Sequence, residues 1–92
     1  MKLIEAIRVL DALDEEGTIY AAEPWTENSE AIVAREPETG GLPAEAKRLG
    51  LSYFLEVFIA SEVIEDWTAN LDTQPTLQQK CARVIEYAIN DA

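Results

Sequence analysis

The strongest structural signal in the sequence is an amphipathic pattern near its C-terminal end. Thr76 and Gln79 have the spacing of a capping box, which begins a helix. Apolar residues then recur at helical intervals: Leu77, Cys81, Val84, Ile85, Ala88 and Ile89. The apolar stripe of such a helix has to be buried against other parts of the chain. The 92 residues are therefore expected to close one core, as a single domain over residues 1–92.

A second amphipathic helix is predicted at the other end of the chain, over residues 2–14. Its apolar positions are again three and four residues apart: Leu3, Ala6, Ile7, Leu10 and Leu13. This helix should end by Gly17, after the acidic run of residues 14–16. Two helices with one apolar face each need a shared surface to pack on.

Short β-prone runs between the two helices supply that surface. Residues 18–22 and 30–35 predict an antiparallel hairpin with a polar connecting loop. Residues 36–43 are loop by composition, and a short helix over residues 44–48 should end at Gly50. The sheet is therefore expected to begin with two adjacent strands.

Residues 51–71 combine two periodicities. Tyr53, Leu55 and Val57 alternate as in a strand, whereas the later apolar residues follow helical spacing: Ile59, Val63, Ile64, Trp67 and Leu71. We interpret the segment as a strand to about Val57 followed by a helix, although the pattern leaves residues 51–58 open between the two. The order of elements predicts an α+β domain, with a small antiparallel sheet of about three strands covered by helices on one face.

Charge is the feature of the sequence that bears most on function. The chain has 18 acidic and 7 basic residues, a net charge of −11, whereas about 2 to 8 charges keep a small domain soluble. Two stretches, residues 9–34 and 49–79, contain no Lys or Arg. Such a surface repels nucleic-acid phosphates and attracts basic proteins at long range. We therefore expect a basic protein as partner and no direct nucleic-acid binding.

Catalytic chemistry is not expected. The chain has no histidine, which removes the commonest general base and the imidazole ligand of metal sites. Cys81, the only cysteine, lies on the apolar stripe of the C-terminal helix, which favours a buried structural thiol over a nucleophile. No stretch has the apolar length of a signal-peptide core or a membrane span. We expect a cytoplasmic protein that is no enzyme and needs no cofactor or metal.

Two acidic clusters have the spacing at which helical side chains meet. Each has carboxylates at i, i+3 and i+4: Asp11, Asp14 and Glu15 in one, Glu62, Glu65 and Asp66 in the other. Such an arrangement could hold a divalent cation, but neither cluster has the glycine-centred loop and additional ligands of an EF-hand. Solvated acidic faces that contact a basic partner are the favoured interpretation.

Trp25 has two competing interpretations. It lies between the carboxylates of Glu23 and Glu27, with Glu30 further on, and a large ring in such a setting is typical of an interface anchor. In the other interpretation, which is favoured, the ring folds over the edge of the sheet and closes the core. Trp67 follows the helical spacing of its segment, so core packing is expected there as well.

Several segments together resemble a family of small acidic bacterial proteins of unknown function. The segments that carry the resemblance are Ile19-Tyr20, Pro24-Trp25, Leu51–Val57, Glu62–Ile64 and Glu86–Ala92. It covers most of the chain, rests on core positions and turn residues, and implies no catalytic residue. In size and charge the chain is also similar to toxin-immunity proteins and to phage-encoded inhibitors of CRISPR effector complexes.

The charge and the missing catalytic groups lead to one functional hypothesis. We expect a non-enzymatic inhibitor, of the immunity or anti-CRISPR type, whose acidic surface docks on a nuclease or CRISPR effector subunit and blocks it. The acidic residues named above and Trp25 are the candidate contacts. Two alternatives stay open: a cytosolic accessory or homo-oligomerisation domain whose acidity serves solubility only, and a small enzyme that uses carboxylates and a metal.

Overall fold

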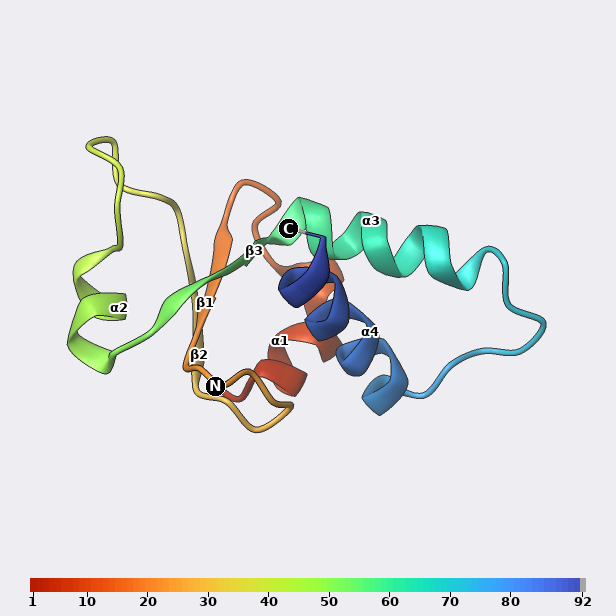
Figure 1. Cartoon of the computed structure of the whole chain (residues 1–92). Coiled ribbons are helices and arrows are strands. Elements are labelled where there is room, and N and C mark those ends of the chain that lie inside the picture. Colours follow the sequence, from red (N-terminus) through yellow and green to blue (C-terminus); the bar gives the residue numbers. More distant parts are fainter. Residues whose placement is uncertain (92) are drawn as a thin grey trace.

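The fold consists of a three-stranded antiparallel sheet and four α-helices. The computed structural model describes residues 1–91. Its elements, in chain order, are α1 (Leu3–Arg8), the 3-10 helix η1 (Leu10–Ala12), β1 (Thr18–Ala21), β2 (Ala31–Ala34), α2 (Ala44–Leu49), β3 (Ser52–Glu56), α3 (Val57–Thr68) and α4 (Leu77–Asn90). In the sheet, β1 lies between β2 and β3 and runs antiparallel to both (Figure 1). The predicted α+β class is confirmed, and so is the strand followed by a helix after residue 51.

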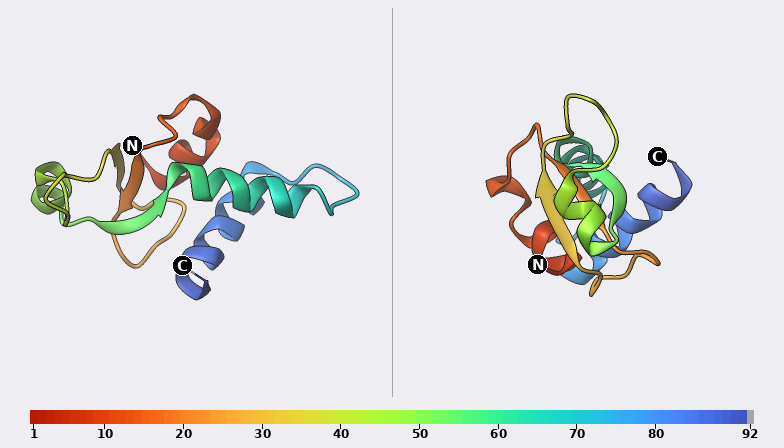
Figure 2. Two further views of the ribbon diagram at one scale, coloured as in Figure 1. Left: turned by 90° about the horizontal axis from the view of Figure 1, so that it is seen from above. Right: turned by 90° about the vertical axis from the view of Figure 1, so that its left-hand side faces the viewer.

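Alternate residues of β1 point to opposite faces of the sheet and separate two apolar clusters. Ile19 and Ala21 belong to the larger cluster, which α1, α3 and α4 close on one face. Tyr20 is buried on the opposite face with Ala46 of α2 and Leu51. The expectation of helices on one face alone is therefore wrong. The molecule is elongated, 42 × 24 × 23 Å, with α2 and the far end of α3 at opposite ends (Figure 2).

Helix α1 ends at Arg8, earlier than the predicted residue 14. The next turn is η1, and a turn over residues 14–17 follows, closed by a hydrogen bond from Gly17 N to Asp14 O at 2.9 Å. Carboxylates at the C-terminal end of a helix oppose its macrodipole, so the acidic run disfavours a longer helix. A Cβ on Gly17 would lie 3.0 Å from Asp14 O and from a methyl carbon of Val33. Glycine therefore lets this turn approach β2 closely.

Helix boundaries elsewhere follow the predicted signals. In the capping box of α4, Gln79 N donates to Thr76 Oγ1 at 3.1 Å and Thr76 N donates to Gln79 Oε1 at 2.8 Å. Helix α2 ends at Gly50, whose φ of 70° is the left-handed conformation that side chains disfavour. Helix α3 begins at Val57 directly after β3, and the Val57 amide donates to Gly17 O at 3.0 Å. The two elements are thus joined without a loop and attached to the turn before β1.

Helix α3 buries a narrower stripe than its sequence pattern predicts. Val57 and Ala60 are buried, and Ile64 packs against the same core. Trp67 is only half-buried and does not belong to this core, so its predicted core role is wrong. On α4, Ile89 is 62% exposed although its spacing places it on the apolar stripe. Parts of both predicted stripes therefore remain at the surface.

Candidate protein-docking surface

The arginines of the chain pair with nearby carboxylates and thereby determine where unpaired negative charge remains. Four arginines form five ion pairs: Arg8 with Glu5, Arg35 with Asp14 and Glu16, Arg48 with Glu45, and Arg83 with Glu86. A sixth joins the Met1 amino group to Glu30 at 3.1 Å. These pairs engage six of the 18 carboxylates, so twelve make no ion pair within residues 1–91.

One group of unpaired carboxylates begins beside an exposed aromatic ring at the start of α3 and continues along the helix. Phe58 is 48% exposed and lines a hollow of about 380 Å³ together with Glu15, Glu16 and Glu56. Three exposed carboxylates continue this surface along α3. We call it the acidic ridge, and it consists of Glu15, Glu56, Phe58, Glu62, Glu65 and Asp66.

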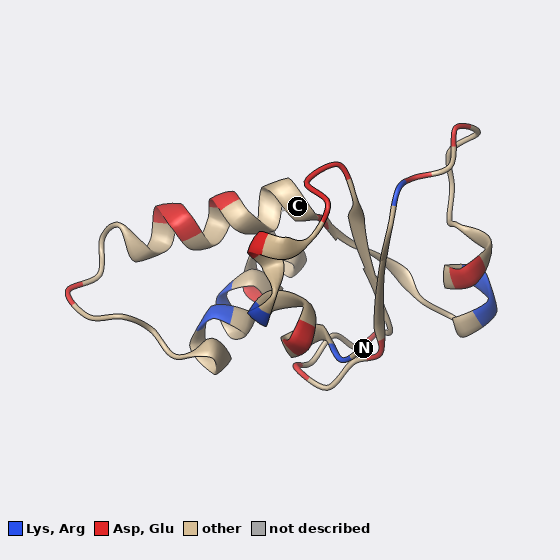
Figure 3. Ribbon diagram, turned by 180° about the vertical axis from the view of Figure 1, so that it is seen from behind, with Lys and Arg blue, Asp and Glu red and all other residues tan. Residues whose placement is uncertain are grey.

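The geometry of the acidic ridge follows from helical spacing and from one backbone contact. Phe58 and Glu62 are four residues apart, so their side chains lie on one side of α3, opposite the buried Ala60. The hydrogen bond from Val57 N to Gly17 O brings the acidic turn beside the same end of the helix. Figure 3 shows the acidic bands of α3 and the acidic turn before β1 along the upper edge of the molecule.

The structure divides the predicted cluster of Asp11, Asp14 and Glu15 among three places. Asp14 accepts a hydrogen bond from Arg35 Nε at 2.8 Å, and Arg35 also contacts Glu16 at 3.0 Å. The Arg35 guanidinium, followed by the donating Glu16 amide, holds the pKa of Asp14 below its usual range. Glu15 belongs to the acidic ridge, and Asp11 lies in a separate groove. The predicted common helical face is wrong because the helix ends before Asp14.

Trp25 is half-buried, and its ring is held by the fold. It packs edge-on against Phe54, with ring centroids 4.9 Å apart and planes at 87°. Its Nε1 donates to Ala21 O at 3.2 Å, and the ring packs against the main core. The interpretation of Trp25 as a ring that closes the core is therefore confirmed.

The three carboxylates predicted to act with Trp25, namely those of Glu23, Glu27 and Glu30, do not all lie beside its ring. Glu23 lines a hollow of about 400 Å³ with Trp25 and the exposed Ile89. Glu27 and Glu30 are not among the residues that line it, and Glu30 is paired with the Met1 amino group. Of the three carboxylates, Glu23 is thus the one that borders this hollow.

Cys81 is fully buried in the main core. Burial, and to a lesser extent the negative charge of Glu27, raises the pKa of its thiol to about 11. A thiol that stays protonated and covered is a poor nucleophile. The predicted structural role of Cys81 is therefore confirmed.

Two kinds of site are not found in the described part of the chain. Across residues 1–91, no group of three or more His, Cys, Asp or Glu side chains is placed to hold a metal ion. The cluster of Glu62, Glu65 and Asp66 shares one exposed side of α3 without forming such a group. Within the same residues, no helix has both the length and the apolar character needed to cross a membrane.

Sequence reasoning missed Phe58, which lies where the strand pattern gives way to the helical one. The available signal was its separation of four residues from Glu62, which places the ring on the acidic side of the helix. No family model, no curated protein and no solved structure matches this chain. The resemblance to small acidic bacterial proteins stays a prediction, and the function has to be argued from the geometry of the chain itself.

Proposed function

We propose that the chain is a non-enzymatic inhibitor that docks through the acidic ridge on the basic surface of a nucleic-acid-handling protein in the cytoplasm. The observation that carries the proposal is the composition of the ridge, in which an exposed aromatic ring lies beside two unpaired carboxylates and three more follow it along the same side of α3. Nucleases and CRISPR effector subunits bind phosphates through grooves rich in Lys and Arg. An array of carboxylates is complementary to such a groove and competes with nucleic acid for it.

The carboxylates and the ring have different tasks in this proposal. Long-range attraction between the ridge and a basic groove accelerates association and orients the two proteins. Phe58 supplies the apolar contact that the carboxylates lack, and buried aromatic anchors hold most of the binding energy of an interface. The face of its ring can also accept an Arg guanidinium of the partner through a cation–π contact.

The test uses two triple variants that remove the same charge. One neutralises the acidic ridge: Glu15→Gln, Glu62→Gln and Glu65→Gln. The matched control neutralises three exposed, unpaired carboxylates elsewhere: Glu36→Gln, Glu38→Gln and Asp72→Asn. The tagged wild-type chain first captures its partner from its native cells. Association is then measured for the three proteins over a range of salt concentrations, with and without competing nucleic acid.

The ridge variant should associate more slowly than the control variant and with a flatter salt dependence, because exposed charges act mainly through the encounter rate. Nucleic acid should displace the wild-type chain from its partner. The proposal is contradicted if the two variants behave alike, or if the partner binds the chain and nucleic acid together. A wild-type chain that captures only copies of itself would support the oligomerisation domain instead.

A second variant tests the ring separately from the charges. Phe58→Ala should raise the dissociation rate about thirtyfold, which corresponds to about 2 kcal/mol for an anchor residue. Because the ring is 48% exposed, the circular dichroism spectrum should stay unchanged. Tyr53 is the matched control, since it is 46% exposed but lies off the ridge. Equal effects of Phe58→Ala and Tyr53→Ala would remove the ring from the proposed interface.

A further inference from the structure

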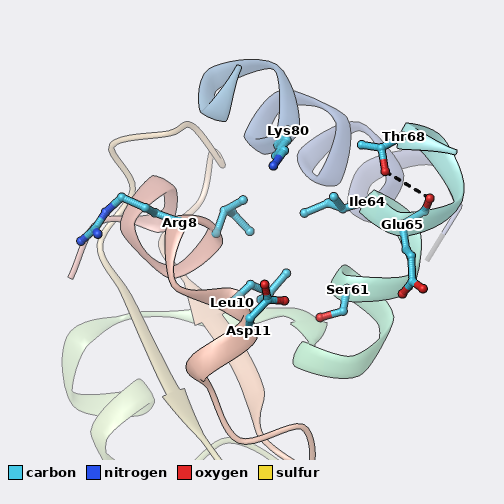
Figure 4. Close-up of a pocket in the computed structure, with 9 residues that line it drawn as sticks. Arg8, Leu10, Asp11, Ser61, Ile64, Glu65, Thr68 and Lys80 are labelled. Atoms are coloured by element: carbon cyan, nitrogen blue, oxygen red, sulfur yellow. Dashed lines mark hydrogen bonds between the residues drawn. The ribbon is translucent and has the colours of Figure 1, made fainter. Parts of the chain in front are cut away.

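A third hollow lies between the three α-helices α1, α3 and α4, beside η1 (Figure 4). Its volume is about 310 Å³, near the lower end of the range for small-molecule sites, about 300 to 1,000 Å³. Ile7, Leu10 and Ile64 form apolar walls. The hydroxyl of Ser61 points toward Asp11 (Figure 4). We call this hollow the three-helix groove.

Two opposite charges enter the three-helix groove from opposite sides. Lys80 reaches it from α4 and Asp11 from η1 (Figure 4). Within residues 1–91 neither makes an ion pair, although Lys80 is half-buried. The Lys80 ammonium has no acidic partner among the described residues, so it can pair with a carboxylate that a ligand brings into the groove. The groove therefore offers one unmatched charge of each sign.

The other charged residues that line the groove are directed elsewhere. Arg8 pairs with Glu5 at 3.5 Å, and its guanidinium points out of the groove (Figure 4). The Glu65 carboxylate points away from Lys80, along the outer side of α3 (Figure 4). Apart from its charged residues, the groove is lined by apolar side chains and by two hydroxyl residues, Ser61 and Thr68, and the Thr68 hydroxyl donates to Glu65 O.

We propose that the three-helix groove binds a small zwitterion whose ammonium and carboxylate lie at opposite ends of an apolar skeleton, as in a dipeptide of aliphatic residues. The ligand ammonium pairs with Asp11, the carboxylate pairs with Lys80, and the aliphatic side chains contact Ile7, Leu10 and Ile64. An anion without an ammonium group is repelled by Asp11 and by the net charge of −11. A cation without a carboxylate leaves Lys80 unmatched. A ligand with both charges pairs with Asp11 and with Lys80 at the same time.

The experiment is a titration of the isotope-labelled full chain with leucyl-leucine. Binding is monitored through the changes in amide chemical shifts in two-dimensional NMR spectra. The largest shifts are expected around Leu10, Ser61 and Lys80. Acetyl-leucyl-leucinamide, which has the same side chains and no charged ends, should cause no such shifts. Lys80→Gln should weaken binding of leucyl-leucine about tenfold, since it removes a hydrogen-bonded charge partner. Lys47→Gln is the control, because Lys47 is exposed on α2, away from the groove.

Three results would overturn the proposal. Leucyl-leucine shifts no amide of the groove, the uncharged peptide binds as tightly, or Lys80→Gln binds as well as Lys47→Gln. The circular dichroism spectrum of each variant shows that it is folded. The outcome is distinguishable from that of the docking proposal, because the titration contains no protein partner and Lys80 lies on α4, outside the acidic ridge.

Discussion

The contacts of Trp25 predict how much the ring contributes to stability. Trp25→Ala removes an edge-to-face pair with Phe54 and a hydrogen bond to Ala21 O. A fully buried Trp→Ala truncation costs about 3–5 kcal/mol, so we expect a loss of about 3 kcal/mol for this half-buried ring. Trp25→Phe keeps a ring beside Phe54 and should cost about 1 kcal/mol. The Ala21 carbonyl still accepts a hydrogen bond from Ser52 Oγ in both variants.

The assay is equilibrium unfolding in urea, monitored by circular dichroism, which gives the free energy of unfolding of each variant. Trp67→Ala is the control, because Trp67 is also half-buried but has no aromatic pair or side-chain hydrogen bond among the described residues. We expect a loss of about 1 kcal/mol for this control, the central value for point substitutions. Equal losses for Trp25→Ala and Trp67→Ala would refute the reasoning, because the contacts of Trp25 would then contribute nothing specific.

The buried thiol and the pair of Asp14 with Arg35 give two further predictions. At neutral pH, maleimide labelling of Cys81 should be limited by opening of the chain, because the thiol is covered and its pKa is about 11. Labelling of folded protein as fast as of urea-unfolded protein would contradict this. The lowered pKa of Asp14 stabilises the fold fully above the ordinary value of 3.8, and this contribution is lost as the pH falls through the lowered pKa. Arg35→Gln should therefore make the unfolding free energy, measured by urea titration, less sensitive to acid, and an unchanged sensitivity would speak against the pairing.

Sequence signals that act within a few residues predicted the elements of this fold well. The capping box of Thr76 and Gln79 begins α4 as predicted, and Gly50 ends α2. Of the alternating residues, Tyr53 and Leu55 lie in β3, and Val57 is the first residue of α3. Apolar spacing continues to Leu13 and therefore predicts too late an end for α1, because the acidic residues that follow Arg8 disfavour the C-terminal turns of a longer helix.

The candidate surfaces were harder to predict, because they depend on how separate elements meet. Helical spacing places Trp67 and Ile89 on apolar stripes. It does not show how far the elements packed against each helix extend along that helix. The groove between Asp11 and Lys80 joins residues from opposite ends of the chain. The position of Phe58 beside the turn at Glu15 likewise requires the contact between Val57 and Gly17.

The direct passage from β3 into α3 has a mechanical consequence. Glu56 is the last residue of β3 and Val57 is the first residue of α3, so the helix continues directly from the strand with no loop between them. The backbone at Phe58 loses its conformational entropy when the chain folds. Binding of a partner therefore costs little further backbone entropy at this position. A load on α3 would be transmitted to the hydrogen bonds between β1 and β3, since no flexible joint lies between the helix and the ladder.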